Sequence, residues 1–192
     1  MSRLKIFVSG ITSLTDARYC AGMGVPYLSV CFDPEGKTEL DSSSFQAIRA
    51  WIEGVEWWGE YAGSDPVVLF SLQEAYVFSG WIVSPDLAEK LSDAPFQKRV
   101  SLEKDSQVLP EFRNVELEIS GPKKEVLAEW VQQGHNVLLK NPEDAHQILA
   151  LHRAFPELIF KLLSGAEERP GWMDLSGLQD VLEELEQEGF GL

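Results

Sequence analysis

Eight short apolar segments, each followed by a longer stretch with helical periodicity, divide nearly the whole chain into repeated units. The segments are LKIFVS (4–9), YLSVCF (27–32), VEWWGEYA (55–62), WIVS (81–84), RVSLE (99–103), VELEIS (115–120), NVLLK (136–140) and LIFKLLS (158–164). Apolar runs of this length, bounded by turn residues, predict strands. Strands that alternate with helices predict a parallel sheet with helical crossovers, and eight such units predict a closed (β/α)8 TIM barrel.

The length of 192 residues restricts how such a barrel can be built. A usual barrel has about 250 residues, so we expect a compact form with trimmed loops and helices, the weakest helix being near residues 105–112. An open doubly wound sheet is the alternative fold, but no G-x-G-x-x-G sequence follows the first segment. Because no linker or break in composition interrupts the chain, we expect residues 1–192 to form one domain.

The charge balance restricts the partners. The chain carries 31 acidic against 16 basic residues, a formal charge of −15. Such a field repels polyanions, so we expect neither nucleic acid nor an anionic membrane surface as a partner. The first residues lack the apolar stretch of a signal peptide, and no run approaches the ~18 apolar residues of a membrane span. The only two cysteines, Cys20 and Cys31, have no C-x-x-C spacing, which fits a reducing cytoplasm.

Polar and apolar residues alternate inside several of the expected strands. In VELEIS, the apolar residues Val115, Leu117 and Ile119 share one face, and the carboxylates lie on the other. The face that meets the helices must be apolar, so the polar side chains are expected to point into the barrel. These inward candidates are Lys5, Ser9, Ser29, Cys31, Asp33, Ser101, Glu103, Glu116, Glu118, Ser120 and Lys161. Ionised groups inside a barrel need partners, which predicts an ion pair between Glu116 and Lys161 or Lys5.

Side chains at the C-terminal ends of barrel strands line the mouth, where the following loops enclose a site. The candidates there are Ser9, Asp33, Glu60, Ser84, Glu103, Glu118, Lys140 and Ser164. Paired carboxylates such as Glu103 and Glu118 can divide acid and base roles between them, although solvated rim carboxylates are common in an acidic protein. Oxygen ligands of this kind suit Mg²⁺ or Ca²⁺, but no spacing supports a metal site, and we predict neither metal nor cofactor.

Other conspicuous residues are interpreted as structural. Trp57, Trp58 and Tyr61 either form an exposed surface for a partner or fill the space between trimmed helices, and we favour packing. The three histidines, His135, His146 and His152, lie away from the expected mouth and are predicted to be surface residues.

Three stretches resemble motifs of the phosphoribosylanthranilate isomerase family. IFVSGITSLTDA resembles K-I-C-G-I-T-x-x-x-D-A, YLSVCFDPEGK is similar to G-F-x-F-x-P-x-S-x-R, and LSGAEERPGWMDLSGLQDVL resembles S-S-G-V-E-x-x-P-G-x-K-D. The resemblance covers both ends of the chain and is only topological from about residue 55 to residue 135. It implies a (β/α)8 barrel and the Amadori rearrangement of N-(5′-phosphoribosyl)anthranilate in tryptophan biosynthesis. In that reaction a general acid opens the ribose ring and a general base removes the proton on C2′.

The resemblance also places the family's catalytic roles on residues of this chain. The family's basic cysteine falls on Ser9, and a hydroxyl is too weak a base to replace a thiolate unaided. Relocated bases would be Cys31, Asp33 or Glu103, although a free cysteine such as Cys31 is more often an inert core residue. The general acid falls on Glu118, or on Ser120 at the same level.

The binding elements depart from the family pattern as well. Lys37 stands beside the expected arginine position at Thr38, and Lys140-Asn141-Pro142 replaces a Gly-Gly turn that binds phosphate. Ser164 and Gly165 remain from the phosphate loop, so Lys37, Glu103, Lys140, Ser164 and Gly165 are the predicted substrate-binding residues. The partner is expected to be a small molecule, phosphorylated if the family's substrate is kept, bound by a monomer or homodimer. The alternative is a barrel without isomerase activity that binds another small polar metabolite or a protein partner.

Overall fold

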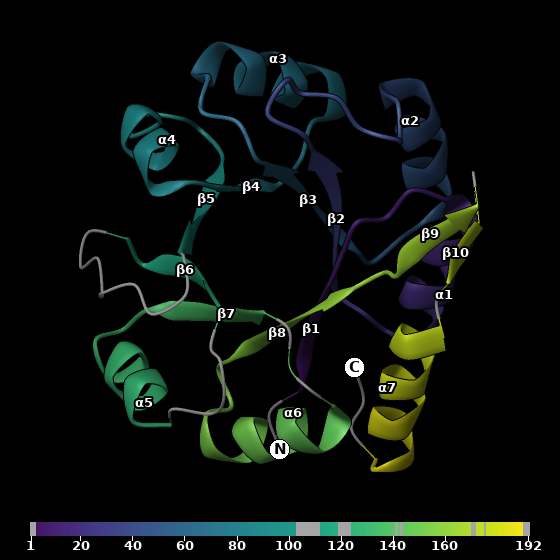
Figure 1. Ribbon diagram of the computed structural model, residues 1–192, viewed down its shortest axis with the longest axis vertical. Helices are drawn as coiled ribbons and strands as arrows, with labels where there is room; N and C mark the ends of the chain where they lie inside the picture. The colour runs from purple at the N-terminus through teal and green to yellow at the C-terminus, as the bar shows by residue number, and fades with distance from the viewer. Residues whose placement is uncertain are drawn as a thin grey trace.

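The computed structural model is a closed barrel of eight parallel strands surrounded by helices (Figure 1). It describes residues 3–102, 112–118, 124–140, 142, 144–169, 172–174 and 176–189. The barrel strands are β1 (Lys5–Ser9), β2 (Tyr27–Phe32), β3 (Glu56–Tyr61), β4 (Gly80–Val83), β5 (Gln97–Leu102), β6 (Asn114–Glu118), β7 (Asn136–Lys140) and β8 (Ile159–Leu163). They follow one another in chain order, and β8 pairs with β1 to close the ring, so the predicted (β/α)8 fold is confirmed.

The helices of the described residues are short, as expected for a compact barrel. They are α1 (Leu14–Gly22), α2 (Ser42–Trp51), α3 (Pro66–Tyr76), α4 (Pro85–Lys90), α5 (Lys124–Gln132), α6 (Ala145–Ala154) and α7 (Ser176–Gln187). The weak helix expected between β5 and β6 falls almost wholly outside the described residues. Among the described residues, no helix has the length and apolar character needed to cross a membrane.

A two-stranded antiparallel sheet, β9 (Ala166–Arg169) and β10 (Trp172–Asp174), is inserted between β8 and α7. In Figure 1 it extends beyond the ring of barrel strands. The sequence did not predict this hairpin, because β9 reads AEER and has no apolar alternation.

Two apolar regions hold the barrel together. The larger one lies between the strands and the helices and includes Trp81, Trp130, Phe45 and Phe160, all 1% exposed or less. A smaller cluster of Phe7, Trp58, Ile82 and Leu138 lies inside the barrel, with Tyr27 and Ile159 packed against it. The aromatic residues of β3 therefore belong to the two cores: Trp57, Trp58 and Tyr61 are each 4% exposed or less. Their interpretation as packing residues is confirmed, and an exposed aromatic surface on this strand is excluded.

The histidine prediction was wrong for two of three residues. His135 is 8% exposed and His152 is 4% exposed, whereas the side chain of His146 is 80% exposed. His152 lies four residues after buried Ile148 in α6 and therefore on the same core-facing side of that helix. His135 follows α5, and its Nδ1 lies 2.8 Å from the carbonyl oxygen of Phe112.

The packing of β3 against β4 depends on glycine at position 59. A Cβ atom there would lie 2.3 Å from Cζ3 of Trp81, a ring that is completely buried. We predict that Gly59→Ala lowers the free energy of unfolding by about 1–3 kcal/mol, because a rigid buried ring has no room to move. Urea unfolding followed by tryptophan fluorescence measures the change.

Gly22→Ala is the matched control, because a Cβ at Gly22 meets nothing within 4 Å and the residue ends helix α1. It is expected to leave stability unchanged or raise it by less than about 1 kcal/mol. Equal stabilities for the two variants would contradict the close approach of Trp81 to β3.

Candidate functional site

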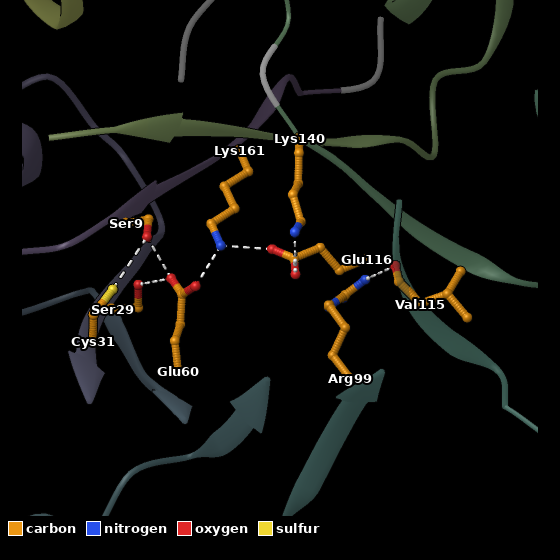
Figure 2. A network of polar contacts seen from close by, with 9 residues as sticks. All are labelled: Ser9, Ser29, Cys31, Glu60, Arg99, Val115, Glu116, Lys140 and Lys161. Atoms are coloured by element: carbon orange, nitrogen blue, oxygen red, sulfur yellow. Dashed lines mark hydrogen bonds and ion pairs between the residues drawn. The ribbon is translucent and has the colours of Figure 1, made fainter. Parts of the chain in front are cut away.

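A lysine in the barrel interior lies between two carboxylates that come from distant parts of the chain. Lys161 on β8 donates to Glu60 on β3 and, at 2.6 Å, to Oε1 of Glu116 on β6 (Figure 2). Lys161 is 6% exposed and Glu116 is 1% exposed. The predicted pairing of Glu116 with Lys161 is therefore confirmed. Lys5, the other partner considered, instead lies 3.6 Å from Glu157.

The same two carboxylates have further polar partners. Lys140 on β7 lies 3.3 Å from the second oxygen of Glu116, and the Ser101 hydroxyl donates to Glu116 as well. Ser9 Oγ donates to Glu60 Oε1 at 2.5 Å, and Ser29 Oγ donates to the same oxygen. Two lysines and two carboxylates thus alternate across the barrel, and both Glu60 oxygens have partners.

The charges of this network stabilise one another. Burial alone would raise the pKa of Glu116, but Lys161 and Lys140 outweigh it, so the pKa falls below its ordinary value. Burial alone would lower the pKa of Lys161, but Glu60 and Glu116 raise it above its ordinary value. At neutral pH the interior therefore holds ionised pairs.

Cys31 lies beside Ser9, with its sulfur 3.6 Å from Ser9 Oγ. The residue reaches the surface at the rim of the mouth, yet burial around the thiol and the charge of Glu60 raise its pKa to about 11. The thiol therefore stays protonated at neutral pH. A cysteine in that state is a poor base and a poor nucleophile.

An open cavity of about 380 Å³ lies over this network at the C-terminal ends of the strands. Glu60, Glu116, Lys140 and Lys161 form its polar floor, and its walls come from the ends of β2, β3, β4 and β5, including Cys31, Tyr61, Val83, Ser84 and Ser101. A smaller cavity of about 260 Å³ shares Cys31 and is lined by Gly10, Thr12, Thr38 and Gly165. Together the two cavities provide room for a small polar molecule.

The phosphate-loop candidates, Ser164 and Gly165, lie close to Ser9. The Ser164 side chain bonds to a backbone carbonyl and not to the lysine–carboxylate network. Ser164 Oγ donates to the Gly10 carbonyl at 2.6 Å, and its amide donates to the Ser9 carbonyl at 2.9 Å. Gly10 has a φ of 81°, a left-handed conformation that favours glycine at this turn. Gly165 lines the smaller cavity, so its backbone is available to a ligand there.

Asp33 and Lys37 are engaged in the loop after β2. Asp33 Oδ1 accepts from the amides of Glu35 and Lys37 at 2.9 and 2.8 Å, and the Lys37 ammonium pairs with Glu35. Neither residue lines the two mouth cavities. The structure therefore groups Ser9, Cys31 and Lys140, and keeps Asp33 and Lys37 apart from them.

Three predicted residues lie wholly or partly outside what the structure describes, and Ser120, the alternative acid, is one of them. Glu103 falls among residues 103–111, and the backbone of Glu118 ends β6 opposite Lys140 while its side chain is not described. Glu60 was predicted from the sequence only as a mouth residue and a candidate oxygen ligand, and Ser29 and Ser101 only as inward polar groups. Among the described residues, no group of three His, Cys, Asp or Glu side chains is arranged to hold a metal ion.

No protein-family model matches the chain, and no curated protein sequence matches it significantly.

Phosphoribosylanthranilate isomerases share its fold. The enzyme from Thermus thermophilus has 18% identity and a TM-score of 0.76, with 96% of this chain and 100% of that chain covered. A monomer form of the dimeric enzyme from Thermotoga maritima has 15% identity and a TM-score of 0.74, covering 96% and 99%. A further structure holds reduced 1-(o-carboxyphenylamino)-1-deoxyribulose 5-phosphate, at 13% identity, a TM-score of 0.74, and 96% and 99% coverage. At such identities, the likeness to phosphoribosylanthranilate isomerases concerns the fold alone.

We predict that Lys161→Met lowers the free energy of unfolding at pH 7 by about 3–5 kcal/mol, because it leaves two carboxylates without their shared partner. The pKa of Glu116 is lowered in the folded protein, so its contribution is present above the ordinary pKa of about 4.3 and lost as pH falls through the folded value. The deficit of the variant should therefore shrink below pH 4.5. Urea unfolding at pH 7 and about pH 3.5 measures both effects.

Lys5→Met is the matched control, since Lys5 is 40% exposed and 3.6 Å from an exposed Glu157. We expect a loss of less than about 1 kcal/mol at either pH. Similar losses for the two variants would contradict the importance of the buried bridge.

The raised pKa of Cys31 predicts slow alkylation by iodoacetamide. At pH 7.5 the rate should be at least about 100-fold below that of a free thiol, whose pKa is about 8.5, and should keep rising toward pH 11. Mass spectrometry of the modified chain follows the reaction. The Cys31→Ser variant should not react, because Cys20 is fully buried with a pKa raised to about 12. A rate that levels off near pH 8.5 would show that the pKa of Cys31 is not raised by its surroundings.

Proposed function

We propose that the chain is an isomerase of the phosphoribosylanthranilate isomerase type, which binds a small phosphorylated amino sugar at the mouth of the barrel. The observation that carries the proposal is the 2.5 Å hydrogen bond from Ser9 to Glu60. Ser9 stands where the resemblance places the family's basic cysteine. Its hydroxyl points to a carboxylate that itself lines the mouth cavity. A carboxylate is thus available next to the position from which the family's base acts.

In this proposal Glu60 is the general base and Glu118 the general acid. The acid gives a proton to the ribose ring oxygen, and the bond from that oxygen to C1′ breaks to leave an iminium group. Glu60 then removes the proton on C2′, the electron pair forms a double bond between C1′ and C2′, and tautomerisation of the resulting enol gives the ketone. A positioned base or acid of this kind typically contributes 10²–10⁴-fold to the rate.

Other described residues support binding of a polar ligand rather than the proton transfers. Lys140 reaches the cavity floor from β7, and Gly165 presents backbone in the adjoining cavity. Cys31 is not proposed as the base, because its pKa of about 11 keeps it protonated at neutral pH. The implied pathway is tryptophan biosynthesis.

A second candidate function is binding without turnover. It is favoured by the engagement of Glu60, whose Oε1 accepts from Ser9 and Ser29 and whose Oε2 accepts from Lys161. A carboxylate with three donors must give up a partner before it can take a proton from a ligand. In that case the mouth is a receptor for a small polar metabolite, and the ion network is purely structural.

Turnover of freshly prepared phosphoribosylanthranilate, followed by the loss of its fluorescence, separates the two functions. The isomerase proposal predicts activity that falls by about 10²–10⁴-fold in Glu60→Gln. Glu157→Gln, an exposed residue outside the mouth, is the control and should retain full activity. No turnover above a blank in protein shown to be folded by circular dichroism would reject the isomerase and leave the receptor.

A further inference from the structure

A separate cavity of about 210 Å³ lies at the opposite end of the barrel, where the strands begin. Its lining includes the first residues of several strands, such as Tyr27, Gln97 and Asn136, together with Phe7, Trp58 and Arg99. None of these residues lines the mouth cavities. The inner apolar cluster and the lysine–carboxylate network lie between this cavity and the mouth, so a ligand bound here would not share the proposed isomerase site.

Arg99 is the unusual residue of this cavity. It is 6% exposed, and its Nη1 donates to the carbonyl oxygens of Val115 and Asn136 at 3.1 and 2.9 Å. Its buried Nε–H has no hydrogen-bond partner. In the described part of the chain, no carboxylate comes within ion-pair distance of the guanidinium. A buried cation whose only described hydrogen bonds go to neutral carbonyls is costly, because it has lost its water without gaining a counter-ion.

Neighbouring carboxylates compensate the charge of Arg99 only from beyond ion-pair distance: Glu116 is engaged by Lys140 and Lys161, and Glu56 lines the cavity. In the network above, Lys140 and Lys161 are already balanced by the two carboxylates that they contact. At the edge of the cavity, Lys5 pairs with Glu157. Burial lowers the pKa of Arg99 to about 10, and the charges of Glu116 and Glu56 offset part of this effect, so the residue remains charged at neutral pH.

The walls of the cavity indicate the shape of a ligand. The Phe7 and Tyr27 rings are stacked with centroids 6.2 Å apart, Trp58 meets Phe7 edge-on at 6.3 Å, and Arg99 lies 5.9 Å from the Trp58 ring. The buried indole N–H of Trp58 also has no partner. Most of the lining is polar, and the aromatic rings form one side of the cavity, next to the guanidinium. This arrangement suits a small planar group that ends in a carboxylate, the anion that matches the guanidinium fork.

We propose that this cavity, where the strands begin, is a second binding site of the protein. It is specific for a small monocarboxylate, with Arg99 as the anion-binding residue. A single negative charge is favoured over a phosphate dianion because Glu56 and Glu157 also line the cavity and repel additional charge. The site takes its ligand from the face opposite the mouth. It is independent of whether the mouth catalyses an isomerisation.

Benzoate and its neutral isostere benzamide are suitable probes, with the intrinsic tryptophan fluorescence, to which Trp58 in the cavity wall contributes, as the signal. Benzoate should give a saturable change with a dissociation constant in the millimolar range or better, and benzamide should bind at least ten-fold more weakly. Equal binding of the two probes, or no saturable change with benzoate up to about 50 mM, would overturn the proposal.

Three variants locate the binding. Arg99→Met removes the charge and should weaken benzoate binding at least ten-fold, whereas Arg153→Met removes an exposed arginine and should bind as wild type. Gln97→Trp places a large ring at the exposed rim of the cavity without replacing Arg99, and should also weaken binding at least ten-fold. This variant tests the location even if Arg99→Met does not fold. Wild-type affinity in Gln97→Trp would show that benzoate binds elsewhere.

Discussion

The bridge from Lys161 to Glu60 and Glu116 is the interaction on which the interior of this barrel depends. It joins β8, β3 and β6 across the barrel axis, three strands that are not neighbours in the ring (Figure 2). The buried carboxylate of Glu116 and the half-buried carboxylate of Glu60 would destabilise the fold if no cation lay between them, and the buried lysine would do the same without them. The network therefore acts as a unit. It also divides the interior, with aromatic packing around Phe7 and Trp58 on one side and a polar cavity floor on the other.

The same division places a carboxylate at the proposed site in the mouth, where the family resemblance leads one to expect a thiolate base. Ser9, at the end of β1, donates a hydrogen bond to Glu60, and in the proposed isomerase this carboxylate is the reactive group at that point of the barrel. Cys31 is near enough to contact Ser9, yet its raised pKa leaves it as a neutral neighbour. A shared fold at 13–18% identity does not fix these groups, because function depends on the site and not on the barrel.

The sequence predicted the fold well because the barrel repeats a local pattern eight times. The strands at 27–32 and 136–140 were predicted with the same bounds that the structure gives. Alternation within β6 and β8 also predicted the ion pair of Glu116 and Lys161. The part played by Glu60 was not predictable in this way, because the sequence gives the face of a strand but not which residue lies opposite it across a closed barrel. The buried position of His152 was predictable from the helical spacing after Ile148, a signal that was missed.

A double-mutant cycle between Lys161 and Glu116 tests the central claim most directly. The free energies of unfolding of the wild type, Lys161→Met, Glu116→Gln and the double variant give the coupling energy of the pair. The account predicts a coupling of at least about 2 kcal/mol, with the double variant more stable than the sum of the single losses implies, because removing both charges leaves one fewer unpaired ion. Additive losses within about 0.5 kcal/mol would show that the two side chains do not stabilise each other and would contradict a network that acts as a unit.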